Sequence, residues 1–119
     1  MRRAARVALS TALVAIVGGG LSACGGTQTE HRTINAAAVT GGAGFTPPTI
    51  TVDKRNRVDI KVGNTTDKTH GFSIEGYGVH QTVEPGKPID VEFTATKAGT
   101  YKVYCQLHPA HQTATLVVR

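Results

Sequence analysis

The residues after position 32 fall into short segments in which polar and apolar side chains alternate. Residues 57–62 (RVDIKV) show this most clearly, and residues 88–94 repeat it. Successive side chains of a strand point to opposite faces, so a period of two is typical of strands with one face in water. No part of the chain shows a long helical period. The pattern therefore predicts an all-β fold.

Turn-forming residues separate these segments at intervals of about eight to twelve residues, the rhythm of a Greek-key β-sandwich of seven or eight strands. The first strand, at 33–40, is expected to lie at a sheet edge, and residues 41–44 to form a flexible turn. Further strands are expected at 49–52, 57–62, 70–75, 79–83, 88–94, 99–104 and 113–118. The expected core consists of Ile50, Val52, Val58, Ile60, Val62, Phe72, Ile74, Val91, Phe93, Tyr101, Val103, Leu116 and Val118.

One connection of the predicted sandwich carries a cluster of metal-ligating residue types. Cys105, His108 and His111 have the spacing C-x2-H-x2-H and lie between the last two predicted strands. A thiolate is a soft ligand and an imidazole an intermediate one, so the set suits copper, zinc or iron better than calcium or magnesium. Pro109 fits a tight connection, because proline cannot donate to a strand ladder. The spacing is also compatible with a buried cysteine beside solvated histidines.

The N-terminal residues have the composition of an export signal. Three arginines within the first six residues precede an apolar run at 7–17, which is too short to span a bilayer comfortably. Residues 21–24 (LSAC) resemble a bacterial lipoprotein signal, in which Cys24 becomes the lipid-modified first residue. An ordinary signal peptide with an incidental cysteine, a buried helix and a twin-arginine export route are the alternatives.

The lipoprotein interpretation divides the chain into a signal peptide at 1–23, a lipid-anchored tether at 24–32 and one domain at 33–119. The expected location is the outer face of the bacterial cytoplasmic membrane, or the periplasm and cell envelope. Loss of the signal removes three arginines and lowers the formal net charge from +5 to +2. The mature chain is then weakly basic, which gives no footprint for nucleic acid, and is long enough for one small domain.

Export also changes how the two cysteines are interpreted. If Cys24 carries lipid, Cys105 has no disulfide partner within the chain. A single thiol kept in an oxidising compartment calls for a reason, and metal ligation is the simplest one.

Two stretches of the sequence resemble the cupredoxins, which are small copper-binding β-sandwiches. They are residues 70–79 (HGFSIEGYGV), with a histidine at a strand start, and residues 99–109 (GTYKVYCQLHP). The similarity extends over about 33–119 and points to plastocyanin-like and nitrosocyanin-like bacterial members. The resemblance implies that His70, Cys105 and His108 bind one copper ion, which cycles between Cu(I) and Cu(II).

The chain departs from the usual cupredoxin pattern at the fourth ligand. Most electron-transfer members have a methionine a few residues after the second histidine, but the only methionine here is Met1. His111 occupies the position at which the short-loop members have this methionine. The resemblance therefore implies that His111 is the fourth metal ligand. The amide oxygen of Gln112, a backbone oxygen and an open coordination position remain alternatives.

These features favour a membrane-tethered, monomeric electron carrier, rather than an enzyme, that exchanges electrons with unidentified redox partner proteins. A copper storage or delivery module and a red-copper enzyme or small-molecule sensor are the alternatives, and the ligand set would also accept zinc. His31, Glu75 and His80 are expected to be solvated surface residues. Tyr101 and Tyr104 are expected to be packing residues.

Overall fold

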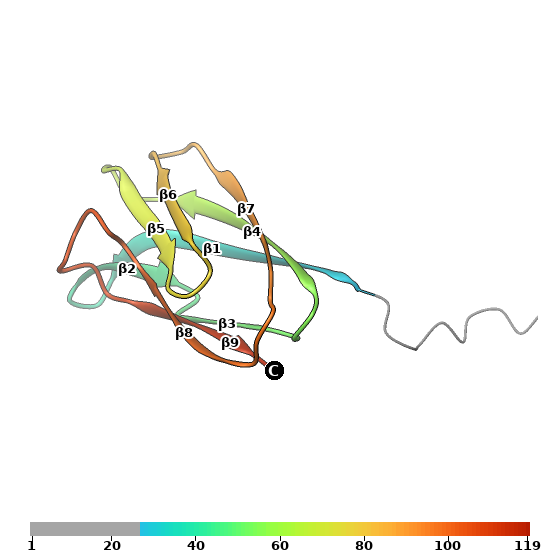
Figure 1. Ribbon diagram of the computed structural model, residues 1–119. Coiled ribbons are helices and arrows are strands. Elements are labelled where there is room, and N and C mark those ends of the chain that lie inside the picture. The colour runs from blue at the N-terminus through green and yellow to red at the C-terminus, as the bar shows by residue number, and fades with distance from the viewer. Residues whose placement is uncertain (1–26) are drawn as a thin grey trace, which may run out of the picture.

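The structure, a computed structural model, describes residues 27–119, and the predicted signal peptide and Cys24 lie outside them. Within this range there are nine strands in two layers (Figure 1) and no helix, hence none that could cross a membrane. The strands are β1 (Thr29–Val39), β2 (Gly42–Thr46), β3 (Thr49–Val52), β4 (Arg57–Asn64), β5 (His70–Ile74), β6 (Val79–Val83), β7 (Ile89–Thr94), β8 (Gly99–Tyr104) and β9 (Ala114–Val118).

The two layers are a four-stranded and a five-stranded sheet. The first has the order β2-β1-β4-β7 and the second the order β3-β9-β8-β5-β6. The pairs β1–β4 and β3–β9 are parallel, and the other pairs are antiparallel. The predicted all-β sandwich is therefore confirmed.

The first strand differs from its prediction in two respects. It begins at Thr29, so residues 29–32, predicted as part of the tether, belong to the sheet and pair with β4 from Arg57 onward. It is also not an edge strand, because β2 and β4 flank it. The side chain of Glu30 helps to hold this segment, since it accepts a 2.7 Å hydrogen bond from the Asp53 amide.

The glycine-rich residues 41–44 were predicted to form a flexible turn, but most of them belong to β2. Gly44 lies opposite Ala37 on β1, where a Cβ would come within 2.8 Å of Val39 Cγ2. Glycine allows this close approach of the two strands. The additional strand raises the total to nine, above the seven or eight predicted.

The core lies between the sheets and contains the predicted side chains. All of them are buried except Phe93 and Tyr101, which are partly exposed and pack against the core. The structure adds apolar residues from segments with weak sequence patterns, notably Ile34, Ala36 and Phe45. This packed core provides a rigid frame for the loops at its ends.

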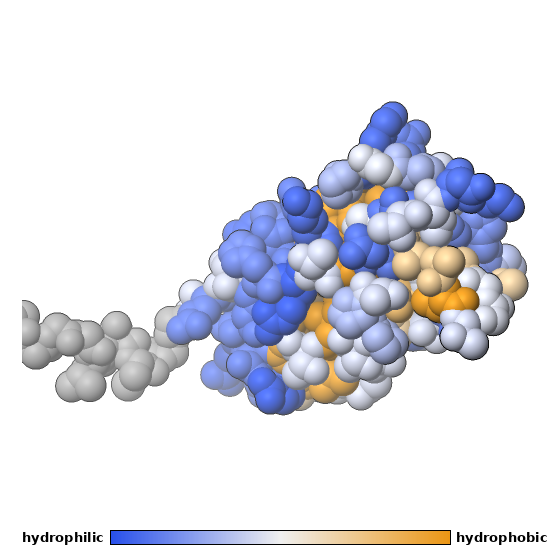
Figure 2. Space-filling view, turned by 180° about the vertical axis from the view of Figure 1, so that it is seen from behind, coloured by the Kyte–Doolittle hydropathy of each residue, from blue (hydrophilic) through white to orange (hydrophobic). Residues whose placement is uncertain are grey.

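The two ends of the sandwich differ in polarity. The connection 105–113 lies at one end, beside the β1–β2 turn and the loop before β5, whereas β1 starts at the other end (Figure 1). Figure 2 shows hydrophilic residues gathered where β1 starts and a mixture of apolar and hydrophilic residues at the opposite end. Leu107, 46% exposed, is the one large hydrophobic side chain exposed in residues 27–119, and it belongs to the connection 105–113.

Candidate metal centre

Three of the four predicted ligands meet at the end of the sandwich that carries the connection 105–113. Cys105 follows β8 directly, and its Sγ lies 3.5 Å from His108 Nδ1 and 3.9 Å from His70 Nδ1. The candidate ligand atoms of these residues all lie within 4.8 Å of one another, close enough to hold one ion. Cys105 is a free, buried thiol, as its proposed role requires.

The pairing of β5 with β8 explains why residues so distant in sequence meet. The two strands are antiparallel, with Ser73 opposite Tyr104. This register places the start of β5, and thus His70, at the same end as Cys105. The predicted position of His70 at a strand start is confirmed.

The loop that precedes His70 is held in place by one buried side chain, that of Asn64. Its Nδ2 donates to the carbonyls of Lys68 at 2.7 Å and Val83 at 2.9 Å. Its Oδ1 accepts hydrogen bonds from the amide and the hydroxyl of Thr66. The position of His70 therefore depends on a loop with little freedom.

Burial keeps the imidazole of His70 neutral. The side chain is almost fully buried, which lowers its pKa, and the neighbouring His111, His108 and Lys68 lower the pKa further. A neutral imidazole is the form that binds metal. The lowered pKa thus favours the form of His70 that can bind metal.

His111 is buried beside the three-residue group but is not part of it. Its ring centroid lies 4.8 Å from that of His70 and 4.5 Å from that of Phe45. Its Nδ1 lies 3.0 Å from the backbone carbonyl of Gln112, so this nitrogen carries the proton and Nε2 keeps its lone pair. Nε2 is buried and has no hydrogen-bond partner in residues 27–119.

A buried, unpaired acceptor is costly, and a metal ion would satisfy it. Burial lowers the pKa of His111 and outweighs the opposite effect of the Gln112 carbonyl. The chemistry of Nε2 therefore fits a fourth donor, although the role of His111 as a ligand stays a prediction.

The other candidates point to different roles. The side-chain amide nitrogen of Gln112 donates to the backbone carbonyl of Thr40 at 2.7 Å. This hydrogen bond links the connection 105–113 to the β1–β2 turn. Glu75 and His80 are exposed and stand outside the three-residue group. His31 is exposed on β1 rather than in a tether, 3.4 Å from Asp59.

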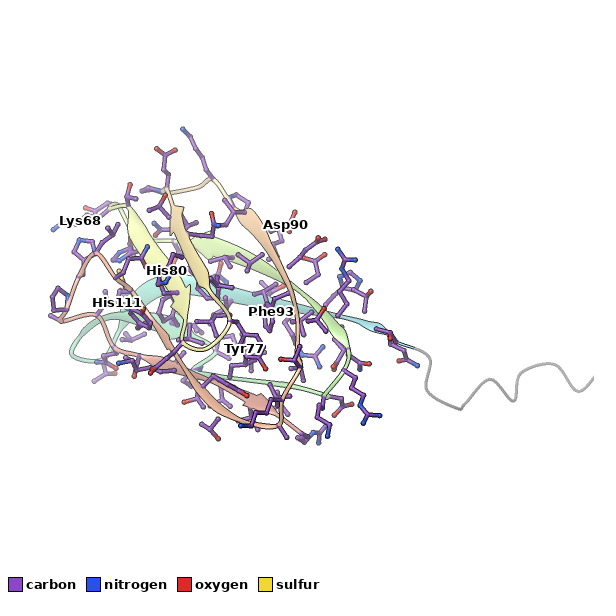
Figure 3. The ribbon with its side chains drawn as sticks, in the orientation of Figure 1. Lys68, Tyr77, His80, Asp90, Phe93 and His111 are labelled. Atoms are coloured by element: carbon purple, nitrogen blue, oxygen red, sulfur yellow. The ribbon has the colours of Figure 1, made fainter. Side chains whose placement is uncertain are left out.

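A hollow of about 230 Å³ gives access to the histidines from solvent. Its walls are formed by the β1–β2 turn, Ala110 and Lys68, and His70, His108 and His111 open onto it. Lys68 and His111 lie at this same end of the molecule in Figure 3.

The residues that surround the thiol were not predicted from the sequence. The amide of Gly71 donates to Cys105 Sγ at 3.1 Å, and Gln106 packs against Gly71. Ser73 is completely buried and bonds to Gln106 at 2.7 Å. A glycine directly after His70 was the available signal, since a side chain there would collide with Gln106, the residue after the thiol.

This arrangement of sheets and of a His–Cys–His group is that of a cupredoxin. The protein-family model described as the cupredoxin-like domain matches residues 11–118 of the sequence. The chain therefore belongs to that family.

The relatives extend to larger proteins. The chain is 30% identical over 80 residues to cytochrome c oxidase subunit 2 from Thermus thermophilus, a match that covers 64% of this chain and 58% of that protein. The chain thus spans little more than half the length of this curated relative. A second sequence of the same subunit from Thermus thermophilus is matched over 47% of its length.

Solved structures share the fold at low sequence identity. A copper nitrite reductase from Nitrosomonas europaea gives a TM-score of 0.65 at 16% identity, over 76% of this chain and 41% of that one. A purple cupredoxin from Nitrosopumilus maritimus gives 0.56 at 18% identity, over 74% of this chain and 99% of that one. The second match covers nearly all of that chain, so the two share the fold over almost its full extent.

Proposed function

We propose that the chain carries single electrons on one copper ion bound by His70, Cys105 and His108, with His111 as the fourth ligand. The observation that supports this most is the group of one thiol and two imidazole Nδ1 atoms, with Sγ–Nδ1 distances of 3.5 and 3.9 Å. The group lies on strands and short loops of one packed sandwich.

Copper supplies the redox chemistry, because it exchanges one electron between Cu(I) and Cu(II) in a thiolate and imidazole environment. The residues of the chain hold the ligands in one arrangement. His70 is fixed by the start of β5 and Cys105 by the end of β8, and Gly71 donates a hydrogen bond to the sulfur. A site that barely rearranges is suited to rapid electron exchange.

Reversible colour in the copper-loaded protein tests this function. We expect an intense thiolate-to-copper absorption band that a reductant bleaches and an oxidant restores over several cycles, with copper still bound. Cys105→Ser should abolish the band while circular dichroism still shows the sandwich, because serine is close to cysteine in size and the rest of the buried core is unchanged. Undiminished colour in Cys105→Ser would contradict the assignment of the thiolate.

The hollow above the histidines supports a second function, in which copper binds an external small molecule or is passed to another protein. Binding of copper only as colourless Cu(I), or a preference for zinc in competition, would favour storage or delivery. A band that responds to added small anions but does not cycle would favour a sensor or enzyme.

We further propose that Cys24 is lipidated and anchors the domain outside the cytoplasmic membrane, where it meets its redox partner proteins as a monomer. In support, β1 starts at the end of the sandwich opposite the candidate site, so an anchor there would leave the site facing away from the membrane (Figure 1). Cys24→Ser should remove the hydrophobic anchor, worth about 0.8 kcal/mol per buried CH2. Fractionation should then find the protein outside the membrane fraction, and equally firm membrane association would contradict lipidation.

A further inference from the structure

A polar network lies directly beside Cys105 and connects it to β6. Ser73 is fully buried on β5, and its hydroxyl donates to Gln106 Oε1 at 2.7 Å. The oxygen of Ser73 also lies 3.0 Å from Nδ1 of His80 on β6. The Gln106 amide nitrogen donates to the backbone carbonyl of Gln81 at 2.9 Å. In Figure 3, His80 on β6 lies farther from the end of the molecule than His111 does, and its partner across the β5–β6 pair is Ser73.

The donors and acceptors of this network can be assigned from their chemistry. An amide oxygen only accepts, so the single hydroxyl proton of Ser73 is used on Gln106. The contact with His80 therefore requires a proton on the imidazole Nδ1, which donates to the Ser73 oxygen. The side-chain amide nitrogen of Gln106 donates to the Gln81 carbonyl. Each group from His80 through Ser73 and Gln106 therefore donates a hydrogen bond to the next.

The network holds the chain at the point where the thiol leaves the sheet. Gln106 is the residue after Cys105, and its side chain covers Gly71, whose amide donates to Cys105 Sγ. A Cβ on Gly71 would overlap the Gln106 amide group and come within 2.9 Å of its backbone nitrogen. The hydrogen bond to sulfur and the position of Gln106 are therefore coupled.

We propose that Ser73 and Gln106 are positioning residues that keep the Gly71 hydrogen bond on the Cys105 thiolate and thereby raise the reduction potential of the copper site. The proposal rests on the proposed copper function. A hydrogen bond to the thiolate withdraws electron density from the metal–sulfur bond and so favours Cu(I) over Cu(II). Without the network, the hydrogen bond from the Gly71 amide to the sulfur lengthens, and the thiolate would then stabilise Cu(II) more strongly.

The copper-loaded protein gives the first test, with the variants Gln106→Ala and Ser73→Ala. We expect both to bind one copper ion and to shift the one-electron equilibrium toward Cu(II) by about tenfold, which corresponds to 59 mV. The double variant should shift no further than either single variant, because both break the same network. Gln81→Ala is the matched control: it removes a glutamine side chain but keeps the backbone carbonyl. Potentials equal to the parent value in both variants, with copper bound, would overturn the proposal.

The metal-free protein gives an independent test, which separates failure of the network from failure of the copper function. Nitrogen-15 NMR should show His80 protonated at Nδ1 in the parent and a mixture of tautomers in Ser73→Ala. Hydrogen exchange of the Gly71 amide should accelerate in Gln106→Ala and Ser73→Ala but not in Gln81→Ala. Unchanged exchange in both variants would refute the coupling even if no copper binds. Gln106 is exposed, so its replacement leaves the core intact.

Discussion

Replacement of His111 by methionine should stabilise the metal-free protein, although the residue is buried. Nε2 of His111 has no partner in the described part of the chain, and a buried polar group left unpaired costs about 1–3 kcal/mol. Methionine is flexible and of similar size, so it can occupy the space beside Phe45 and His70 without that cost. The substitution also removes the hydrogen bond to the carbonyl of Gln112, which is worth about 1 kcal/mol.

The balance is a gain of about 1 kcal/mol in the free energy of unfolding. For a domain of this size, that raises the melting temperature by about 4–8 °C. Chelator-treated protein should be unfolded in urea, with His31→Met as the control, since His31 is 73% exposed and its replacement should change stability by less than about 0.5 kcal/mol. In the copper-loaded protein, the weaker thioether donor should raise the reduction potential. A metal-free variant that is less stable than the parent, with an unchanged potential, would show that His111 serves packing alone.

Three further substitutions test the fold and the surroundings of the site. Burial alone would raise the pKa of Glu30, but hydrogen bonds from Asp53 and Asn56 and the ion pair with Arg32 lower the pKa below its ordinary value. The stabilisation from this lowered pKa is fully present above the unfolded-state pKa of about 4.3 and is lost as the pH falls through the lower folded-state pKa. Glu30→Gln should therefore weaken the pH dependence of the free energy of unfolding in this range, measured as a pH series of urea unfolding curves. Phe72→Ala empties the centre of the core and should cost about 3–5 kcal/mol in thermal or urea unfolding, whereas a cost below about 1 kcal/mol would mean that the core is not packed as described. Gly71→Ala should displace the chain at Gln106 and weaken copper binding in a chelator competition, and unchanged affinity would contradict the close contact.

The sequence predicted the parts of the fold in which local pattern and tertiary environment agree. β4 alternates strictly, and Val58, Ile60 and Val62 are buried on one face as expected. β2 was missed because its glycines signal a turn locally, and only the adjacent β1 makes it a strand. The start of β1 was missed for a similar reason, since its charged residues are held by side-chain hydrogen bonds that no periodicity reveals.

The candidate site was accessible from sequence for the residues with distinctive chemistry. Cys105 and His108 are three residues apart, and the family resemblance added His70, which the β5–β8 pairing brings to them. The network of Ser73 and Gln106 could not be predicted, because serine and glutamine are common and their contacts depend on three-dimensional placement. Whether His111 completes the site depends on the metal, and it stays a prediction.

X-ray absorption at the copper edge of the loaded protein tests the central claim most directly, because it counts the sulfur atoms bound to the metal. Cys105 is the one thiol of the candidate group, so we predict one short copper–sulfur contact together with imidazole nitrogens, and loss of the sulfur contact in Cys105→Ser. A spectrum of the parent protein with nitrogen and oxygen neighbours but no sulfur would contradict the proposed copper site.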